Sequence, residues 1–429
     1  MTAKTAFGTG VLVLSGHVAV AVVGVVALRI YTELAPPGVF GEANLLLSAL
    51  ALGMQVVIAP FTASQLRFHT QAQTRGDAVQ FTRESLVWSL RAALVLAIAC
   101  SVGFYLWRQS HGQSAEILAA GASAIWLIAM TARNVLMSRL QAERRQAAYT
   151  GIQVLEAILL AVLTALALKR SATIGSYVTG QAFAIVMLLM LLARLVPWPK
   201  ACKGERGRAN VGFLSKVLSY GVPFVPMSLL TWVANLADRY AVAFLLGATA
   251  VGEYVAPFAI ASRGMALVNV GLNDFFRPIL FDAENQGDAL KAQHVFRSWI
   301  ATSVCLSAAA LVFLFFAGGL VSSILLAKEY RASAVGVMMW VALGYGVFGV
   351  NQIFETRLLS LNRSARLLPS MTLGAATNIL FSLVLVSRNG LIGAAQATCA
   401  SFALQAVVAA LILYLALRQA RISQAQLPA

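Results

Sequence analysis

Long hydrophobic stretches, separated by short polar segments, recur from one end of the chain to the other. A helix needs about 20 apolar residues to cross the roughly 30 Å hydrocarbon core of a bilayer. The stretches reach that length and lack the alternation of roughly ten-residue segments that is typical of a membrane β-barrel. We therefore predict an all-α membrane protein. About twelve spans are expected, over residues 8–31, 39–62, 86–107, 115–137, 149–168, 173–195, 216–246, 250–276, 298–317, 333–356, 366–386 and 391–417.

Composition agrees with this pattern. Of 429 residues, 59% are hydrophobic and only 11% are charged, and the mean hydropathy is +0.79. Soluble proteins carry about 25% charged residues, so a water-soluble enzyme is excluded. The first stretch exceeds the ~7–15 residue core of a signal peptide, which predicts a retained helix.

The net charge of +16 comes from 32 basic and 16 acidic residues. With both termini in the cytoplasm, 21 of the basic residues fall on the cytoplasmic side, six on the opposite side and five within the predicted spans. This distribution follows the positive-inside rule and gives no reason to expect a nucleic-acid partner. It predicts a multi-pass membrane protein with both ends cytoplasmic.

The two halves of the chain resemble each other. The segment Val39-Phe40-Gly41-Glu42 aligns with Ala250-Val251-Gly252-Glu253, and Arg139-Leu140 aligns with Arg357-Leu358. We expect a pseudo-symmetric pair of six-helix lobes, residues 1–196 and 216–429, joined by a basic loop at 197–215. Such repeats are typical of alternating-access transporters.

Five arginines and three firmly embedded acids lie inside the predicted spans, where a charge is costly and usually faces a wet cavity or a partner. Arg91 and Arg133 lie near predicted cytoplasmic boundaries, so their side chains are expected to extend to the headgroups. The repeat makes Arg29 and Arg239 near-equivalents, and their guanidinium groups suit a phosphate. Arg263 is a third candidate. A structural ion pair with a nearby acid is the alternative for Arg239 and Arg263.

The acids are Glu156, Asp238 and Asp274, which are candidates for ion coupling because a buried carboxyl group can load and release a proton. A structural salt bridge to a cavity arginine is the alternative for Glu156. Trp232 and Asn235 share one helix face with Arg239. An aromatic ring and an amide on that face fit a glycan, although a tryptophan is also common in ordinary packing.

Several short segments together resemble the polysaccharide transporter and O-antigen flippase family of the multidrug/oligosaccharidyl-lipid/polysaccharide (MOP) exporter superfamily. They are Tyr220-Gly221-Val222-Pro223, Pro226, Asn235, Asp238-Arg239-Tyr240, Gly247, Val251-Gly252-Glu253-Tyr254 and Leu34–Gly41. The similarity is diffuse and covers nearly the whole chain. Glu42-Ala43 departs from the family's usual small or apolar residue followed by an aromatic.

The resemblance implies a V-shaped, MATE-like bundle of two lobes around a cationic cavity. It implies transport of undecaprenyl-pyrophosphate-linked oligosaccharide repeat units across the bacterial inner membrane for surface polysaccharide synthesis, with Arg29, Arg239 and Arg263 at the pyrophosphate. The expected partners are the lipid-linked oligosaccharide, membrane lipid, and a polysaccharide polymerase with its export machinery.

Three other functions compete with this interpretation. A drug or cation antiporter of the same superfamily would need cavity carboxylates. A membrane glycan polymerase or glycosyltransferase usually needs a large extramembrane loop, whereas the predicted non-cytoplasmic loops are short. A purely structural role in an export complex is the third.

The sequence contains no GxxxxGK[ST] motif, and its four cysteines and four histidines are scattered. We therefore expect no ATPase, other enzyme activity, metal or cofactor. The candidate energy sources are a proton or sodium gradient and the downstream consumption of the product.

Overall fold

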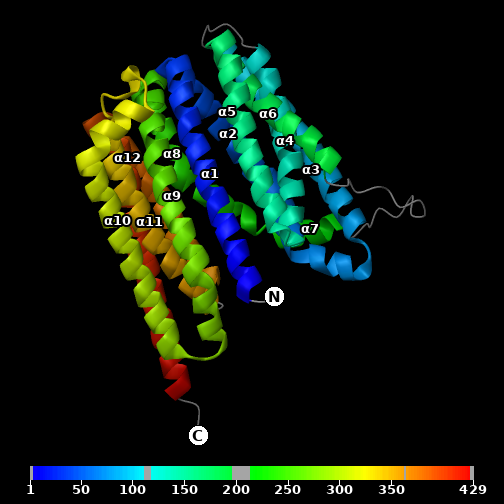
Figure 1. Ribbon diagram of the computed structural model, residues 1–429, viewed down its shortest axis with the longest axis vertical. Helices are drawn as coiled ribbons and strands as arrows, with labels where there is room; N and C mark the ends of the chain where they lie inside the picture. The colour runs from blue at the N-terminus through cyan, green and yellow to red at the C-terminus, as the bar shows by residue number, and fades with distance from the viewer. Residues whose placement is uncertain (1–2, 111–116, 196–212, 362–363, 426–429) are drawn as a thin grey trace. The chain divides into compact units, whose positions relative to one another are not determined.

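The computed structural model describes residues 3–110, 117–195, 213–361 and 364–425, and every regular element within them is helical. The first part contains α1 (Ala3–Leu34), α2 (Pro37–Arg75), α3 (Ala78–Ser110), α4 (Ile117–Ala142), α5 (Gln146–Arg170), α6 (Ile174–Leu195) and the short α7 (Phe213–Gly221). The second contains α8 (Phe224–Leu246), α9 (Ala248–Asn285), α10 (Ala289–Leu325), α11 (Ala334–Ser360) and α12 (Leu368–Ala425), with 3₁₀ turns at Lys328–Tyr330 and Ser364–Leu367. Figure 1 shows the long helices of each part and the short α7.

Eleven of the described helices are long and apolar enough to cross a membrane. The 58 residues of α12 would be about 87 Å long if straight, nearly three times the hydrocarbon thickness. The helix is broken at Gly390, which has a φ of 60°, and Gly393 lies against the carbonyl of Leu385. A hydrogen bond of 3.2 Å from Asn378 to Ser401 then joins the two segments. The described residues therefore contain twelve spanning segments, as predicted.

One predicted span was wrong. The hydrophobic stretch 216–246 forms two helices, because Val222-Pro223 separates α7 from α8. Proline lacks the backbone N–H that a continuing helix needs. The nine residues of α7 are too few to cross the bilayer, and its buried residues Phe213 and Val217 pack with Phe61 of α2.

The chain forms two compact units, Met1–Leu229 and Leu230–Ala429, which divide within α8. In the first unit, α2, α3 and α4 pack pairwise, and in the second unit α9, α10 and α11 do the same. Leu140 and Leu358, which the sequence repeat equates, are both buried near the end of the fourth long helix of a half. The two equated leucines thus have similar burial, while the symmetry of the lobes stays a prediction. The expected lobe boundary at 197–215 lies largely outside the described residues and stays a prediction.

Small residues allow the helices of each unit to approach closely, as is usual in membrane proteins. In the first unit, Ala93 and Ala97 of α3 pack with Leu50, Trp126 and Ile185. In the second unit, Ala283 and Ala292 pack around Trp299 and Ile353.

Candidate functional site

A pocket of about 460 Å³ lies in the first unit between α2, α4, the start of α5 and the first turns of α8. Its lining combines apolar and thioether groups with amides, hydroxyls and one guanidinium group. The residues are Met54, Gln55, Ile58, Ala59, Thr62, Ala63, Leu66, Arg133, Asn134, Met137, Ser138, Gln141, Tyr149, Phe224 and Ser228. Such a lining can bind an amphipathic molecule that needs both hydrogen bonds and apolar contact.

Arg133 is the cation of this pocket, and Glu156 of α5 holds it. The Arg133 Nε and Nη2 atoms donate to Glu156 Oε2 over 2.8 and 2.5 Å. Nη1 donates to Asn134 Oδ1 over 2.9 Å. The prediction that Arg133 extends to the headgroups was therefore wrong, because a carboxylate from the neighbouring helix binds its guanidinium group. The salt bridge that we considered for Glu156 is present.

Arg29 lies in the last two turns of α1, where it forms an ion pair with Glu33 one helical turn later. The nearby Thr32 hydroxyl donates to the backbone carbonyl of Arg29. The Tyr31 hydroxyl donates to the backbone carbonyl of Leu160 in α5. The guanidinium group of Arg29 thus carries a local counter-charge at the end of its helix. A role in phosphate binding stays a prediction for this residue.

Asp238 is the most enclosed acid of the predicted set. It is 1% exposed, and three donors from three helices surround its carboxylate. Tyr254 Oη of α9 donates over 2.5 Å, Thr398 Oγ1 of α12 over 3.1 Å, and the backbone N–H of Arg239 over 2.8 Å. A buried carboxylate with its lone pairs satisfied in this way ties α8, α9 and α12 together.

Arg239 follows directly in the chain, and its guanidinium carbon lies 5.4 Å from the centre of the Phe258 ring. This is within the distance of a cation–π contact. Asn235, one turn earlier, donates to the carbonyl of Thr231 over 2.7 Å and lies 3.5 Å from Tyr345 Oη. The structure therefore brings Asn235, Asp238 and Arg239 together in the second unit.

Trp232, the aromatic residue of the predicted glycan face, packs against Tyr240 with ring centres 5.6 Å apart. This contact between two residues of one helix is compatible with ordinary packing and with a platform for a sugar ring.

Arg263 and Asp274 are both exposed on α9. Arg263 is 15 residues from the start of the helix, or about 22 Å along its axis, and Asp274 is 26 residues or about 39 Å along it. A hydrocarbon core of roughly 30 Å that begins at the start of α9 thus contains Arg263 and ends before Asp274.

Two polar groups of the second unit were given no site role by the sequence analysis. Glu355 accepts hydrogen bonds from Asn351 over 2.9 Å and from Gln405 over 3.2 Å. Arg357, near the end of α11, forms an ion pair with Glu284 near the end of α9. Only the spacing of Asn351 and Glu355, four residues apart on one helix, could have been noticed in the sequence. Among the described residues, no group of three or more metal-ligating side chains is found.

Comparison with known proteins gives matches of structure alone. No family model and no curated protein matches the sequence. An inward-facing multidrug resistance MATE family transporter of the MOP superfamily is 13% identical, with a TM-score of 0.71 over 97% of this chain and 100% of that one. A MOP superfamily transporter from Pyrococcus furiosus is 13% identical, with a TM-score of 0.64 over 95% and 94%.

A MATE transporter from Vibrio cholerae is also 13% identical, with a TM-score of 0.64 over 97% of both chains. The structural similarity extends over nearly the full length of each protein. At 13% sequence identity it shows a shared fold only. The described part of the chain is thus an all-α, multi-pass membrane protein with the fold of the MATE transporters of the MOP superfamily.

Proposed function

We propose that this protein is a transporter that moves lipid-linked oligosaccharides across the bacterial inner membrane by alternating access, with the pyrophosphate of the cargo bound by arginine. The fold supports a transport role because the solved structures that share it are transporters. In this proposal both termini are cytoplasmic, and the cargo is a polyprenyl-pyrophosphate repeat unit for surface polysaccharide.

The observation that carries the choice of an anionic cargo is the state of the buried acids. Glu156 is bound by Arg133. Asp238 is bound by Tyr254, Thr398 and the Arg239 backbone. A cationic drug would need a carboxylate that is available to it, and these two are already engaged by their own unit. The carboxylate of Glu355 is likewise hydrogen-bonded by the amides of Asn351 and Gln405. The cation Arg263 of α9, in contrast, is exposed and lies within the stretch of that helix that the hydrocarbon core can contain.

The neutral polar groups support a sugar as the other part of the cargo. The pocket of the first unit presents the amides of Gln55, Asn134 and Gln141 with several hydroxyls. Amides and hydroxyls both donate and accept hydrogen bonds, as sugar hydroxyls require. The thioethers and aliphatic side chains of the same pocket suit the apolar faces of the sugar rings.

An ion-coupled multidrug or cation antiporter is the second candidate, and the fold supports it equally because MATE transporters include multidrug resistance proteins. The Pyrococcus furiosus transporter is described as having a binding pocket of reversed polarity that suggests a different function. The same fold therefore accommodates pockets of different charge, and the charge of the cargo has to be measured.

The test reconstitutes the purified protein in liposomes with a fluorescent polyprenyl-pyrophosphate oligosaccharide and follows its exposure to an impermeant quencher. We expect the wild type to move the lipid and both Arg263→Gln and Arg239→Ala to slow it at least tenfold. Arg297→Gln is the matched control, because Arg297 is an exposed arginine near the start of α10. A parallel assay measures ethidium movement driven by a proton or sodium gradient.

Movement of ethidium without movement of the lipid would reject this proposal and favour the antiporter function. In cells, deletion of the gene should leave lipid-linked repeat units facing the cytoplasm and reduce surface polysaccharide. Unchanged polysaccharide together with greater drug sensitivity would also reject the proposal.

A further inference from the structure

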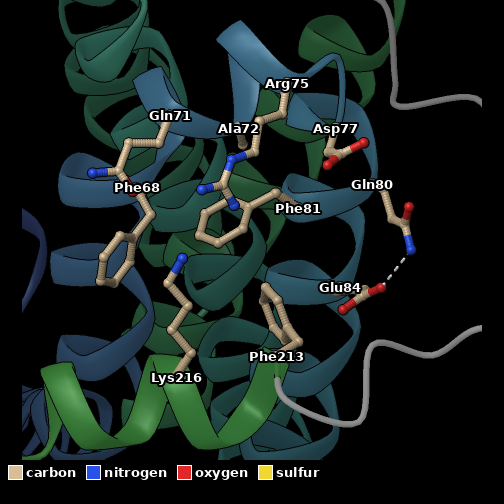
Figure 2. Close-up of a pocket in the computed structure, with 10 residues that line it drawn as sticks. All are labelled: Phe68, Gln71, Ala72, Arg75, Asp77, Gln80, Phe81, Glu84, Phe213 and Lys216. Atoms are coloured by element: carbon tan, nitrogen blue, oxygen red, sulfur yellow. Dashed lines mark hydrogen bonds between the residues drawn. The ribbon is translucent and has the colours of Figure 1, made fainter.

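A second pocket, of about 340 Å³, lies in the first unit where α2 ends and α3 begins, beside α7. Figure 2 shows the ten residues that line it. The side chains of Arg75 and Lys216 point from opposite sides toward the space between Phe68 and Phe81. The pocket therefore combines two converging cations with aromatic walls, and it shares no lining residue with the pocket of the candidate functional site.

The cations and the aromatic walls are held in place by their neighbours. Lys216 Nζ lies 4.4 Å from the centre of the Phe68 ring, at cation–π distance. Phe81 and Phe213 pack edge to face with ring centres 5.2 Å apart. These contacts join α7 to both α2 and α3, so the shape of the pocket is largely set before a ligand binds.

The acids of the pocket do not neutralise its centre. Asp77 and Glu84 lie on the outer side in Figure 2, and the Glu84 carboxylate accepts a hydrogen bond of 2.9 Å from the Gln80 amide. An anion can thus enter between Arg75 and Lys216, while a hydroxyl group attached to it can reach the outer acids. This arrangement fits a phosphodiester that bears a polyol.

The pocket lies close to the membrane boundary. Gly221 at the end of α7 packs directly against Pro60 of α2, and Ser64 donates to the carbonyl of Val217 over 3.2 Å. Helix α8 begins at Phe224 and has 23 residues, or about 34 Å, which is little more than one hydrocarbon thickness. Helix α7 is therefore placed at the end of a membrane-spanning helix, where headgroups lie.

We propose that this pocket binds the headgroup of an anionic phospholipid, with its phosphodiester between Arg75 and Lys216 and its glycerol carbons against Phe68 and Phe81. Anionic lipids are the phosphate source that is concentrated at the cytoplasmic surface, the side to which the predicted orientation assigns the pocket. The aromatic walls suit the apolar part of the same molecule. The site is separate from the proposed cargo, so it does not depend on the transport proposal.

The test is native mass spectrometry of the full-length protein in detergent, titrated with phosphatidylglycerol or with phosphatidylcholine. The double variant Arg75→Gln/Lys216→Gln should lose at least tenfold in phosphatidylglycerol affinity, which is about 1.4 kcal/mol. The control Arg67→Gln/Arg83→Gln removes two exposed cations of α2 and α3 that do not line the pocket. It should change the affinity less than twofold, and Lys216→Arg should retain binding.

Equal losses in the pocket and control variants would overturn the proposal, because they would show a general attraction of lipid to basic residues. A second arm measures the melting temperature of the protein in phosphatidylcholine nanodiscs with inorganic phosphate. Stabilisation by phosphate that the pocket variant abolishes, without tighter binding of phosphatidylglycerol than of phosphatidylcholine, would overturn the lipid assignment in favour of a soluble phosphate compound. Elution of each variant as a single peak on size exclusion checks its folding.

Discussion

The ion pair between Arg133 and Glu156 offers the most direct test of how the first unit is held together. We predict that Arg133→Leu and Glu156→Leu each destabilise the protein strongly, while the double variant regains most of the loss. Each single variant leaves one buried charge without its partner, whereas the double variant replaces both charges with apolar groups of similar size.

The magnitude follows from the geometry. Glu156 Oε2 accepts two charge-assisted hydrogen bonds, of 2.8 and 2.5 Å, and the two side chains are only 15% and 11% exposed. Removing one partner of such a buried pair costs about 3–5 kcal/mol. An unfolding entropy of roughly 2.1 cal/mol/K per residue gives about 0.9 kcal/mol/K for 429 residues, so each single variant should lower the melting temperature by about 3–6 °C.

The assay is thermal unfolding of the purified protein in nanodiscs, followed by far-UV circular dichroism and tryptophan fluorescence. The four proteins of the double-mutant cycle are compared in the same lipid and at the same pH. Single variants that melt within 1 °C of the wild type would refute the reasoning, and so would a double variant that is as unstable as the single ones. Transport that survives in the double variant would assign the pair a structural role only.

Two further predictions concern close contacts in the two units. Gly221→Ala should destabilise α7, because a Cβ atom there would meet the backbone of Pro60, whereas Gly319→Ala, where a Cβ meets open space, should not destabilise the protein. Their melting temperatures provide the comparison, and equal values for the two variants would contradict the contact. Tyr254→Phe removes the 2.5 Å hydrogen bond to Asp238 and should cost about 1–3 kcal/mol. Denaturant unfolding measures this loss, and an unchanged midpoint would show that Asp238 finds another donor.

Much of the fold could be predicted from the sequence because every span must be an apolar segment long enough to cross the bilayer as a helix. The length of each apolar stretch indicated a helix. The sequence also predicted separate spans at 366–386 and 391–417, and in the structure α12 is broken between them, at Gly390. The polar continuations of the helices could not be predicted in this way. Helix α2 continues to Arg75, well past the predicted end at residue 62. Phe68 in this continuation packs against Tyr220 of α7, a contact that hydrophobicity does not report.

The candidate site was harder to predict, because its decisive contacts join residues that are distant in the chain. Sequence spacing reveals partners on one helix, such as Arg29 and Glu33. It does not reveal that Arg133 and Glu156 meet between α4 and α5. Asp238 could be chosen as an unusual charge, but Thr398, 160 residues away, could not be identified as its donor. The phosphate, glycan and ion-coupling roles assigned from sequence stay predictions for transport assays.

The contact between α2 and α7 also affects the order in which the chain is made. Ser64 and Val217, which hydrogen-bond to each other, are 153 residues apart in the sequence. At a synthesis rate of about 5–20 residues per second, the α2 surface stays uncovered for roughly 8–30 s after it leaves the ribosome. Helix α7 is the last piece of the first unit to be made before α8 begins. Val222, Pro223 and the first turns of α8, up to Leu229, are the only part of the first unit that follows it. All of the first unit is therefore synthesised before the second unit begins at Leu230.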